Sequence, residues 1–168
     1  MDNLEKLLIG EDDFEMKMEN LVLPWAEDNV RDTYFTTSDG ARLHYHFAIP
    51  KNPKAVIVMV HGFCEFYPKY HEMTYYMYNM GYAFYFLEQR GHGLSRRYVD
   101  EMDKVTVDSY DSYVQDLREF ITFVIDREES VKRLKKILFA HSMGGAVSSL
   151  FMERHPDTFA RAVAWGNM

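Results

Sequence analysis

Apolar residues occur in short runs along the chain, and the spacing within each run distinguishes strands from helices. Nearly continuous apolar runs of five or six residues are typical of parallel strands that are covered on both faces. Four such runs predict strands at residues 55–60, 82–87, 136–140 and 160–165. Two β-rich runs at 34–37 and 43–47 flank Ser38-Asp39-Gly40 and predict a hairpin.

Helical periodicity appears between these strands. Met73, Met77 and Met80 are spaced i, i+4, i+7 ahead of Gly81, and residues 110–125 form an amphipathic pattern. A further helix is predicted from Gly144 to Arg154, ahead of Pro156. Strands that alternate with helices in this way favour an α/β fold. We expect a mostly parallel open sheet with helices on both faces and right-handed crossovers.

The first thirty residues have a different character. Leu4, Leu7, Leu8, Phe14, Met18 and Leu21 recur at roughly helical spacing among acidic residues. An acidic polar face makes contact with an anionic membrane unfavourable, so we expect a helix that packs on the domain. The chain is therefore divided into an N-terminal helical segment, 1–30, and an α/β region, 31–168.

Composition narrows the class of protein. The 168 residues are 47% hydrophobic, enough for one core, and the net charge of −7 argues against nucleic acid as a partner. The single cysteine excludes an intrachain disulfide. The sequence shows no secretory signal and no transmembrane segment, which predicts a cytoplasmic protein.

Candidate chemistry is concentrated at Ala140-His141-Ser142-Met143-Gly144-Gly145, where a buried strand turns directly into a helix. A serine on such a sharp turn projects its hydroxyl above the sheet as a nucleophile. The small residues Ala140 and Gly144 leave room for the closely approaching backbone. The N-terminus of the following helix favours developing negative charge. We predict that Ser142 is the catalytic nucleophile.

A second motif, His61-Gly62-Phe63, directly follows the buried strand at 55–60. Acyl transfer needs two backbone N–H groups aimed at the tetrahedral oxyanion, one after the nucleophile and one from the loop after the third strand. Phe63 and Met143 occupy these places, and they are the predicted oxyanion hole. Without the motif at Ser142, His61-Gly62 would predict only an ordinary tight turn with a buried histidine.

These two motifs, together with Glu88-Gln89-Arg90-Gly91-His92-Gly93-Leu94-Ser95, resemble the lysophospholipase and monoacylglycerol lipase branch of the α/β-hydrolases. The resemblance extends from the first hairpin to residue 168. It implies the α/β-hydrolase fold, truncated after the sixth strand, and a small lipid or ester substrate without a cofactor. It also implies that Arg90, His92 and Ser95 support the site, and that Glu65 orients the oxyanion loop.

A catalytic base and acid are not evident. In this fold the acid and then the histidine follow the serine, and only Glu153, His155 and Asp157 do so here. A helix of thirteen residues would carry His155 about 20 Å from the serine. The resemblance places both partners on later strands. We therefore expect an N-terminal fragment with an exposed sheet edge at 162–165 that allows self-association.

The leading hypothesis is a serine hydrolase of carboxylic esters that acts through an acyl-enzyme on Ser142. The alternatives are a catalytically silent fragment that pairs with another chain, and an acyltransferase on the same fold. His44 and His46 share one strand face and can in principle bind a metal, but the sequence shows no third ligand. We accordingly predict no metal site.

Overall fold

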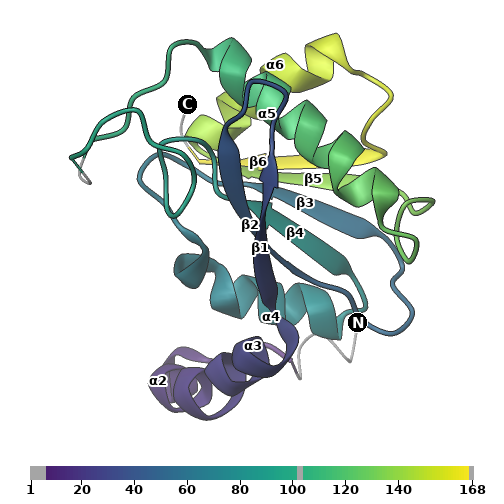
Figure 1. Ribbon diagram of the computed structural model, residues 1–168. Coiled ribbons are helices and arrows are strands. Elements are labelled where there is room, and N and C mark those ends of the chain that lie inside the picture. The colour runs from purple at the N-terminus through teal and green to yellow at the C-terminus, as the bar shows by residue number, and fades with distance from the viewer. Residues whose placement is uncertain (1–6, 102–103, 167–168) are drawn as a thin grey trace.

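The computed structural model describes residues 7–101 and 104–166, which form a six-stranded sheet covered by helices (Figure 1). The strand order is β1-β2-β4-β3-β5-β6. The strands are β1 (Arg31–Thr36), β2 (Arg42–Ala48), β3 (Val56–Val60), β4 (Ala83–Leu87), β5 (Lys136–His141) and β6 (Arg161–Trp165). All four predicted parallel strands and the predicted hairpin are present.

Strand direction follows the sequence pattern. β1 and β2 are antiparallel partners at one side of the sheet, and β2 joins β4 in antiparallel register. β3 runs parallel to β4 and β5, and β5 runs parallel to β6. Register pairs Val60 with Ala140, so the loops that follow β3 and β5 begin side by side at the carboxyl edge of the sheet.

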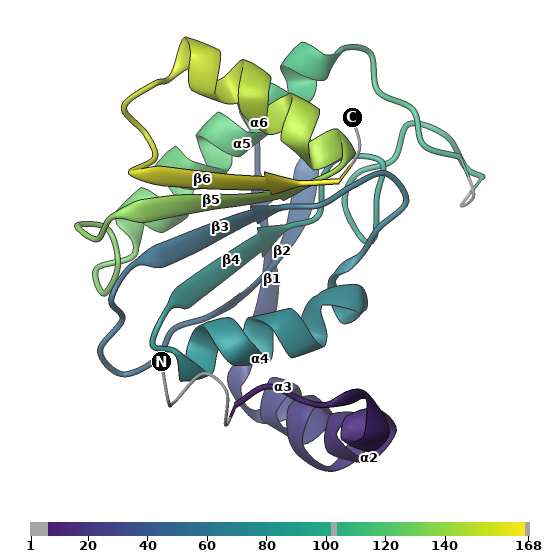
Figure 2. The ribbon, with the colours of Figure 1, turned by 180° about the vertical axis from the view of Figure 1, so that it is seen from behind.

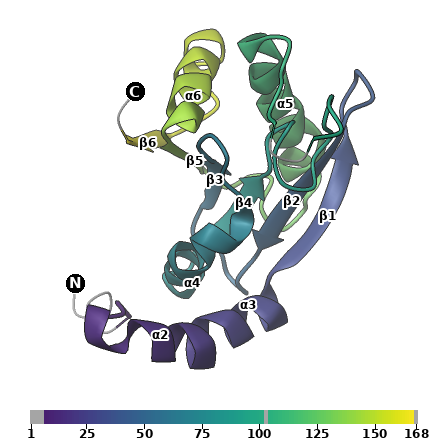
Figure 3. The ribbon, with the colours of Figure 1, turned by 90° about the vertical axis from the view of Figure 1, so that its left-hand side faces the viewer.

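Helices lie on both faces of this sheet, as the turned views show (Figures 2 and 3). α4 (His71–Asn79) covers one face, while α5 (Tyr110–Phe123) and α6 (Met143–Arg154) cover the other. The side chains of β3 alternate between these two layers. Val56, Val58 and Val60 pack toward α5 and α6. Burial on both faces explains why β3 is apolar at every position.

The N-terminal helical segment differs from the prediction. Helical structure begins at residue 11 with a 3-10 turn (Glu11–Asp13), continues as α2 (Phe14–Lys17) and a π-helical turn (Met18–Val22), and ends with α3 (Leu23–Asn29). Leu4 lies outside the described residues, and Leu7 and Leu8 precede the helix.

The predicted packing face of this segment is wrong. Phe14 and Leu21 are exposed, whereas Val22 and Ala26 are buried, and Trp25 packs edge-on against Tyr75 and Tyr78 of α4. The π-helical turn shifts the helical phase, and Pro24 is accommodated in the first turn of α3, where no backbone donor is needed. The segment does pack on the domain, through α3 and α4 (Figure 3).

The opposite edge of the sheet is formed by β6. This strand is exposed along its whole length, and Val163 and Trp165 are 51% and 58% exposed. Within the part of the chain that the structure describes, β6 pairs only with β5. The predicted exposed edge is therefore present, while self-association through it stays a prediction. No helix among these residues has the length and apolar character needed to cross a lipid bilayer.

Candidate active site

Ser142 stands at the junction between β5 and α6. The strand ends at His141, the helix begins at Met143, and the serine between them has φ 48° and ψ −120°. A non-glycine residue in this region of backbone space is strained by roughly 1–3 kcal/mol, and such strain is concentrated at functional sites. The Ser142 side chain is half-buried, and its backbone N–H donates to the Trp165 carbonyl at 2.9 Å.

Gly144 is required by the close approach of α6 to the end of β3. A Cβ atom at this position would lie 2.2 Å from the carbonyl oxygen of Val60 and 2.6 Å from that of His61. Only glycine fits there, because two rigid backbone carbonyls block any side chain. The helix N-terminus after Ser142 is therefore held directly beside the loop that carries His61, Gly62 and Phe63.

Glu65 joins this loop to the strand that carries the serine. Its Oε2 accepts the Gly62 N–H at 2.7 Å and lies 2.9 Å from His141 Nδ1. The hydroxyl of Tyr70 donates to the same oxygen at 2.5 Å, and Lys69 pairs with the other oxygen. A buried carboxylate thus connects the loop after β3 to the residue before Ser142.

The electrostatic state of Glu65 follows from these partners. Burial by itself raises the pKa of the Glu65 carboxyl, but the hydrogen bonds from Lys69, Tyr70 and His141 lower it to about 2. The carboxylate is therefore ionised at neutral pH and acts as an acceptor in all four contacts. Phe63, whose backbone N–H is a predicted oxyanion donor, lies two residues before Glu65 on the same loop and is 58% exposed.

His61 holds the loop after β3 against the loop after β4. Its Nδ1 lies 2.7 Å from the Gly62 carbonyl, and its Nε2 accepts the backbone N–H of Gln89 at 3.0 Å. Complete burial lowers the pKa of His61 to about 4, so the ring is neutral. The side-chain amide of Gln89 donates a hydrogen bond to the His61 carbonyl at 2.7 Å.

The loop after β4 is fixed by side chains from distant elements. Arg90 donates to both carboxylate oxygens of Asp116 at 2.6 and 2.5 Å, and to Asp39 at 2.9 Å. Ser95 donates to the Glu88 carbonyl at 2.5 Å, and its Oγ accepts the His44 N–H at 2.8 Å. These contacts fix the loop after β4 in place, while the supporting role that the resemblance implies for it stays a prediction.

No histidine in the described residues hydrogen-bonds to the Ser142 hydroxyl. His141 is engaged by Glu65 and packs on Trp165. His155 follows the last residue of α6, at the far end of a helix of 12 residues, and its ring packs at a tilt against Phe151. As predicted, α6 separates His155 from the serine.

Glu88 joins His44 and His46 in a cluster of titratable side chains that the sequence did not reveal. Glu88, at the end of β4, lies 3.0 Å from His44 Nδ1 and 3.4 Å from His46 Nε2. The three side chains border a cavity of about 560 Å³ between the loops after β3 and β4, and Ser142 is not part of its lining. Because Glu88 is 42 residues from His46 in the chain, no local pattern could reveal this grouping.

Comparison with known proteins agrees with this fold. The model of a hydrolase family described as serine aminopeptidase, S33, matches residues 51–168. Lysophospholipase L2 of Escherichia coli (strain K12) is 36% identical over 101 residues, covering 60% of this chain and 29% of that protein. Monoacylglycerol lipase of Mycolicibacterium smegmatis is 27% identical over 133 residues, covering 79% of this chain and 45% of that protein.

Solved structures show the same architecture. A soluble variant of monoglyceride lipase from Saccharomyces cerevisiae, in complex with a substrate analogue, has a TM-score of 0.67 at 22% identity, covering 80% of this chain and 43% of that one. A thermostable carboxyl esterase from Bacillus coagulans has a TM-score of 0.69 at 18% identity, covering 81% and 44%. The chain spans less than half the length of each of these four proteins. The α/β-hydrolase fold and the likeness to the lysophospholipase and monoacylglycerol lipase branch are confirmed.

Proposed function

The chain belongs to the serine aminopeptidase S33 family of α/β-hydrolases, and we propose that its Ser142 is the nucleophile of a carboxylic ester hydrolase. The serine Oγ forms a bond to the ester carbonyl carbon, and the alcohol leaves with a proton. Water then cleaves the acyl-enzyme, releases the acid and restores the serine hydroxyl.

The observation that carries this proposal is the backbone of Ser142. Ser142 has a φ of 48° between a buried strand and a helix. A strained turn of this kind is the one that would project a serine hydroxyl above the sheet as a nucleophile. Gly144, pressed against the Val60 carbonyl, holds the helix N-terminus in the position that this turn requires. The strained residue and the glycine that its turn requires lie two residues apart, which supports Ser142 as the nucleophile.

The oxyanion hole of the proposed reaction consists of the backbone N–H groups of Phe63 and Met143. The contacts of Glu65 support this assignment, because they keep the loop after β3 next to His141. We expect both nitrogens to lie about 3 Å from an oxygen bound beside the serine hydroxyl. The ionised Glu65 acts as a positioning residue for the loop and does not contact substrate.

The base and the acid are proposed to come from a part of the protein outside residues 7–101 and 104–166. The longer length of the relatives supports this, and so do the contacts of the described histidines, none of which involves the serine hydroxyl. We also propose that the N-terminal segment, 1–30, whose helical part begins at residue 11, is separate from 31–168, the N-terminal part of the hydrolase domain. In that arrangement the exposed edge at β6 receives the next strand.

The proposed substrates are single-chain lipid esters, such as lysophospholipids or monoacylglycerols. The names of the relatives support this class, and so do exposed apolar side chains at the carboxyl edge of the sheet. Phe63, Phe66 and Leu94 are 58%, 52% and 63% exposed there. A single acyl chain bound over these residues would gain roughly 25 cal/mol for each Å² of apolar surface that it buries.

Turnover of a chromogenic short-chain ester tests the proposal. The proteins compared are the 168-residue chain, a longer chain continued by the C-terminal part of a relative, and Ser142→Ala in the longer chain. We expect slow turnover by the first, fast turnover by the second, and a loss of at least about a thousandfold in the third. Ser149→Ala on the exposed side of α6 is the matched control and should retain full activity.

The outcomes separate the alternatives. Equal turnover with and without Ser142 would overturn the proposal, and fast turnover by the 168-residue chain would reveal a base within it. A longer chain that folds but hydrolyses nothing would favour the silent fragment. Acyl transfer to an added alcohol in preference to water would favour an acyltransferase.

A further inference from the structure

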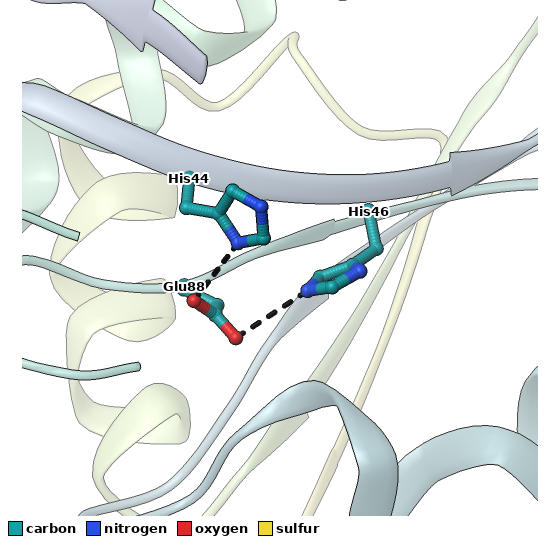
Figure 4. A group of neighbouring side chains, drawn as sticks. All are labelled: His44, His46 and Glu88. Atoms are coloured by element: carbon teal, nitrogen blue, oxygen red, sulfur yellow. Dashed lines mark hydrogen bonds and ion pairs between the residues drawn. The ribbon is translucent and has the colours of Figure 1, made fainter. Parts of the chain in front are cut away.

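His44, His46 and Glu88 direct their polar atoms toward one another beside the loop after β4 (Figure 4). Both histidines come from β2, and Glu88 directly follows β4, the antiparallel neighbour of β2. Each residue offers one atom that could bind a metal, and these three atoms all lie within 4.8 Å of one another. Two nitrogens and one carboxylate oxygen form a common donor set for zinc.

The rings are held in place by contacts on their outer sides. His46 stacks on Tyr67 with ring centroids 4.1 Å apart, and the ring of His44 packs on that of Tyr34 at 4.7 Å. His44 Nε2 lies 2.9 Å from Asp32 Oδ1. A carboxylate on the outer nitrogen of a histidine fixes the tautomer that leaves the inner nitrogen free to bind a metal.

We propose that His44 Nδ1, His46 Nε2 and a carboxylate oxygen of Glu88 bind one zinc ion, oriented by Asp32 and open to solvent on the side of the neighbouring cavity. That cavity, of about 560 Å³, is lined by all three residues. Three protein ligands leave a fourth tetrahedral position for a water molecule or for a ligand that enters the cavity.

The required adjustments are small. Bonds of about 2.0–2.1 Å to a tetrahedral zinc place neighbouring ligand atoms roughly 3.3 Å apart. Glu88 Oε2 lies 3.0 Å from His44 Nδ1, and Glu88 Oε1 lies 3.4 Å from His46 Nε2. Rotation of the Glu88 carboxylate would bring one oxygen to a zinc ion held between the two rings. Calcium and magnesium are disfavoured, because both prefer an all-oxygen set and this cluster presents two imidazoles.

Without metal, the Glu88 carboxylate lies within hydrogen-bond distance of both rings. Burial lowers the pKa of His44, but the carboxylates of Glu88 and Asp32 outweigh that effect and raise it overall. Zinc binding requires the neutral form of His44, with Nδ1 unprotonated. Binding would fasten β2 to the loop after β4, because Glu88 also accepts the Leu94 N–H at 2.7 Å. This role is independent of Ser142.

Competition between the 168-residue chain and a chromogenic chelator for Zn²⁺ tests the proposal. We expect one zinc per chain, together with the visible absorption of tetrahedral Co²⁺ when cobalt replaces it. His46→Phe keeps a ring on Tyr67 but removes the ligand nitrogen, and should weaken zinc binding at least about a hundredfold. Asp32→Asn, at a largely exposed carboxylate, should weaken it about tenfold.

His71→Phe is the matched control, because His71 also packs on Tyr67 and is not part of the cluster. Its zinc affinity should equal that of the original chain. The proposal is overturned if the folded chain binds no stoichiometric zinc, or if His46→Phe binds it as tightly as the original. If His46→Phe fails to fold by circular dichroism, unchanged affinity in Asp32→Asn would overturn the proposal instead.

Discussion

Two loops at the carboxyl edge of the sheet are held in place by different means. The turn after β5 depends on its backbone: a strained Ser142, and a Gly144 that fits only because it has no side chain. The loop after β4 depends on side chains that reach it from elsewhere, with Arg90 bound to Asp116 and Asp39. The first is specified by adjacent residues, and the second by residues far apart in the chain.

This difference decides which substitutions each loop tolerates. The turn after β5 is sensitive to atoms that are added, because its neighbours are rigid backbone. The loop after β4 is sensitive to atoms or charges that are removed, because buried polar partners are then left without a bond. The following predictions test this contrast, beginning with the largest expected effect.

Gly144→Val should abolish folding of the chain, or destabilise it by more than about 4 kcal/mol. Its Cβ would lie 2.2 Å from the Val60 carbonyl oxygen, and neither backbone segment can move without disrupting the sheet. The measurement is the urea midpoint by circular dichroism. Gly10→Ala is the control, because a Cβ there meets nothing within 4 Å. A folded Gly144→Val variant with an unchanged midpoint would contradict the claim that backbone packing defines the turn.

Asp116→Asn should destabilise the chain by about 3 kcal/mol, because buried Arg90 loses its bidentate partner and keeps only the bond to the largely exposed Asp39. The side chains of Arg90 and Asp116 are only 4% and 2% exposed. Glu101→Gln removes an exposed ion pair with Lys104 and should leave the urea midpoint unchanged. Equal urea midpoints for the original chain, Asp116→Asn and Glu101→Gln would show that the loop after β4 does not depend on its side-chain bonds.

Acid should weaken the connection that His61 makes between the loop after β3 and the loop after β4. Because the folded-state pKa is lowered to about 4, the contribution of neutral His61 is fully present above its ordinary pKa near 6.5. It is lost as the pH falls from about 6.5 to 4, at a cost of roughly 3 kcal/mol. Free energies of unfolding at a series of pH values measure this. His61→Gln should be less stable at neutral pH and should lose less stability across that window. If the free energy of unfolding depends on pH in the same way in the original chain and in His61→Gln, then His61 does not cause the loss of stability in acid.

Ser142→Gly should stabilise the chain by about 1 kcal/mol, because glycine adopts a positive φ without strain. Ser149→Gly, at an exposed position within α6, should destabilise it by a few tenths of a kcal/mol through lower helix propensity. Thermal unfolding of both variants provides the comparison. Destabilisation by Ser142→Gly would mean that the observed backbone of the turn carries little strain.

The same contrast explains how far the sequence could predict the structure. The strands and the turn at Ser142 were predictable, because apolar runs and small residues at fixed offsets reflect local geometry. The grouping of Glu88 with His44 and His46 was not, because it depends on the pairing of β2 with β4. The packing face of the N-terminal helix was also missed, since a π-helical turn at Met18–Val22 moved the contact to Val22 and Ala26.

The most direct test of the central claim is the site of covalent modification by a fluorophosphonate. The longer chain, continued by the C-terminal part of a relative, is treated with the reagent, digested and mapped by mass spectrometry. We predict an adduct on Ser142, within residues 136–154, that is absent from Ser142→Ala and reduced by a competing monoacylglycerol. Modification of another residue, with Ser142 left unmodified in the folded protein, would contradict the assignment of Ser142 as the nucleophile.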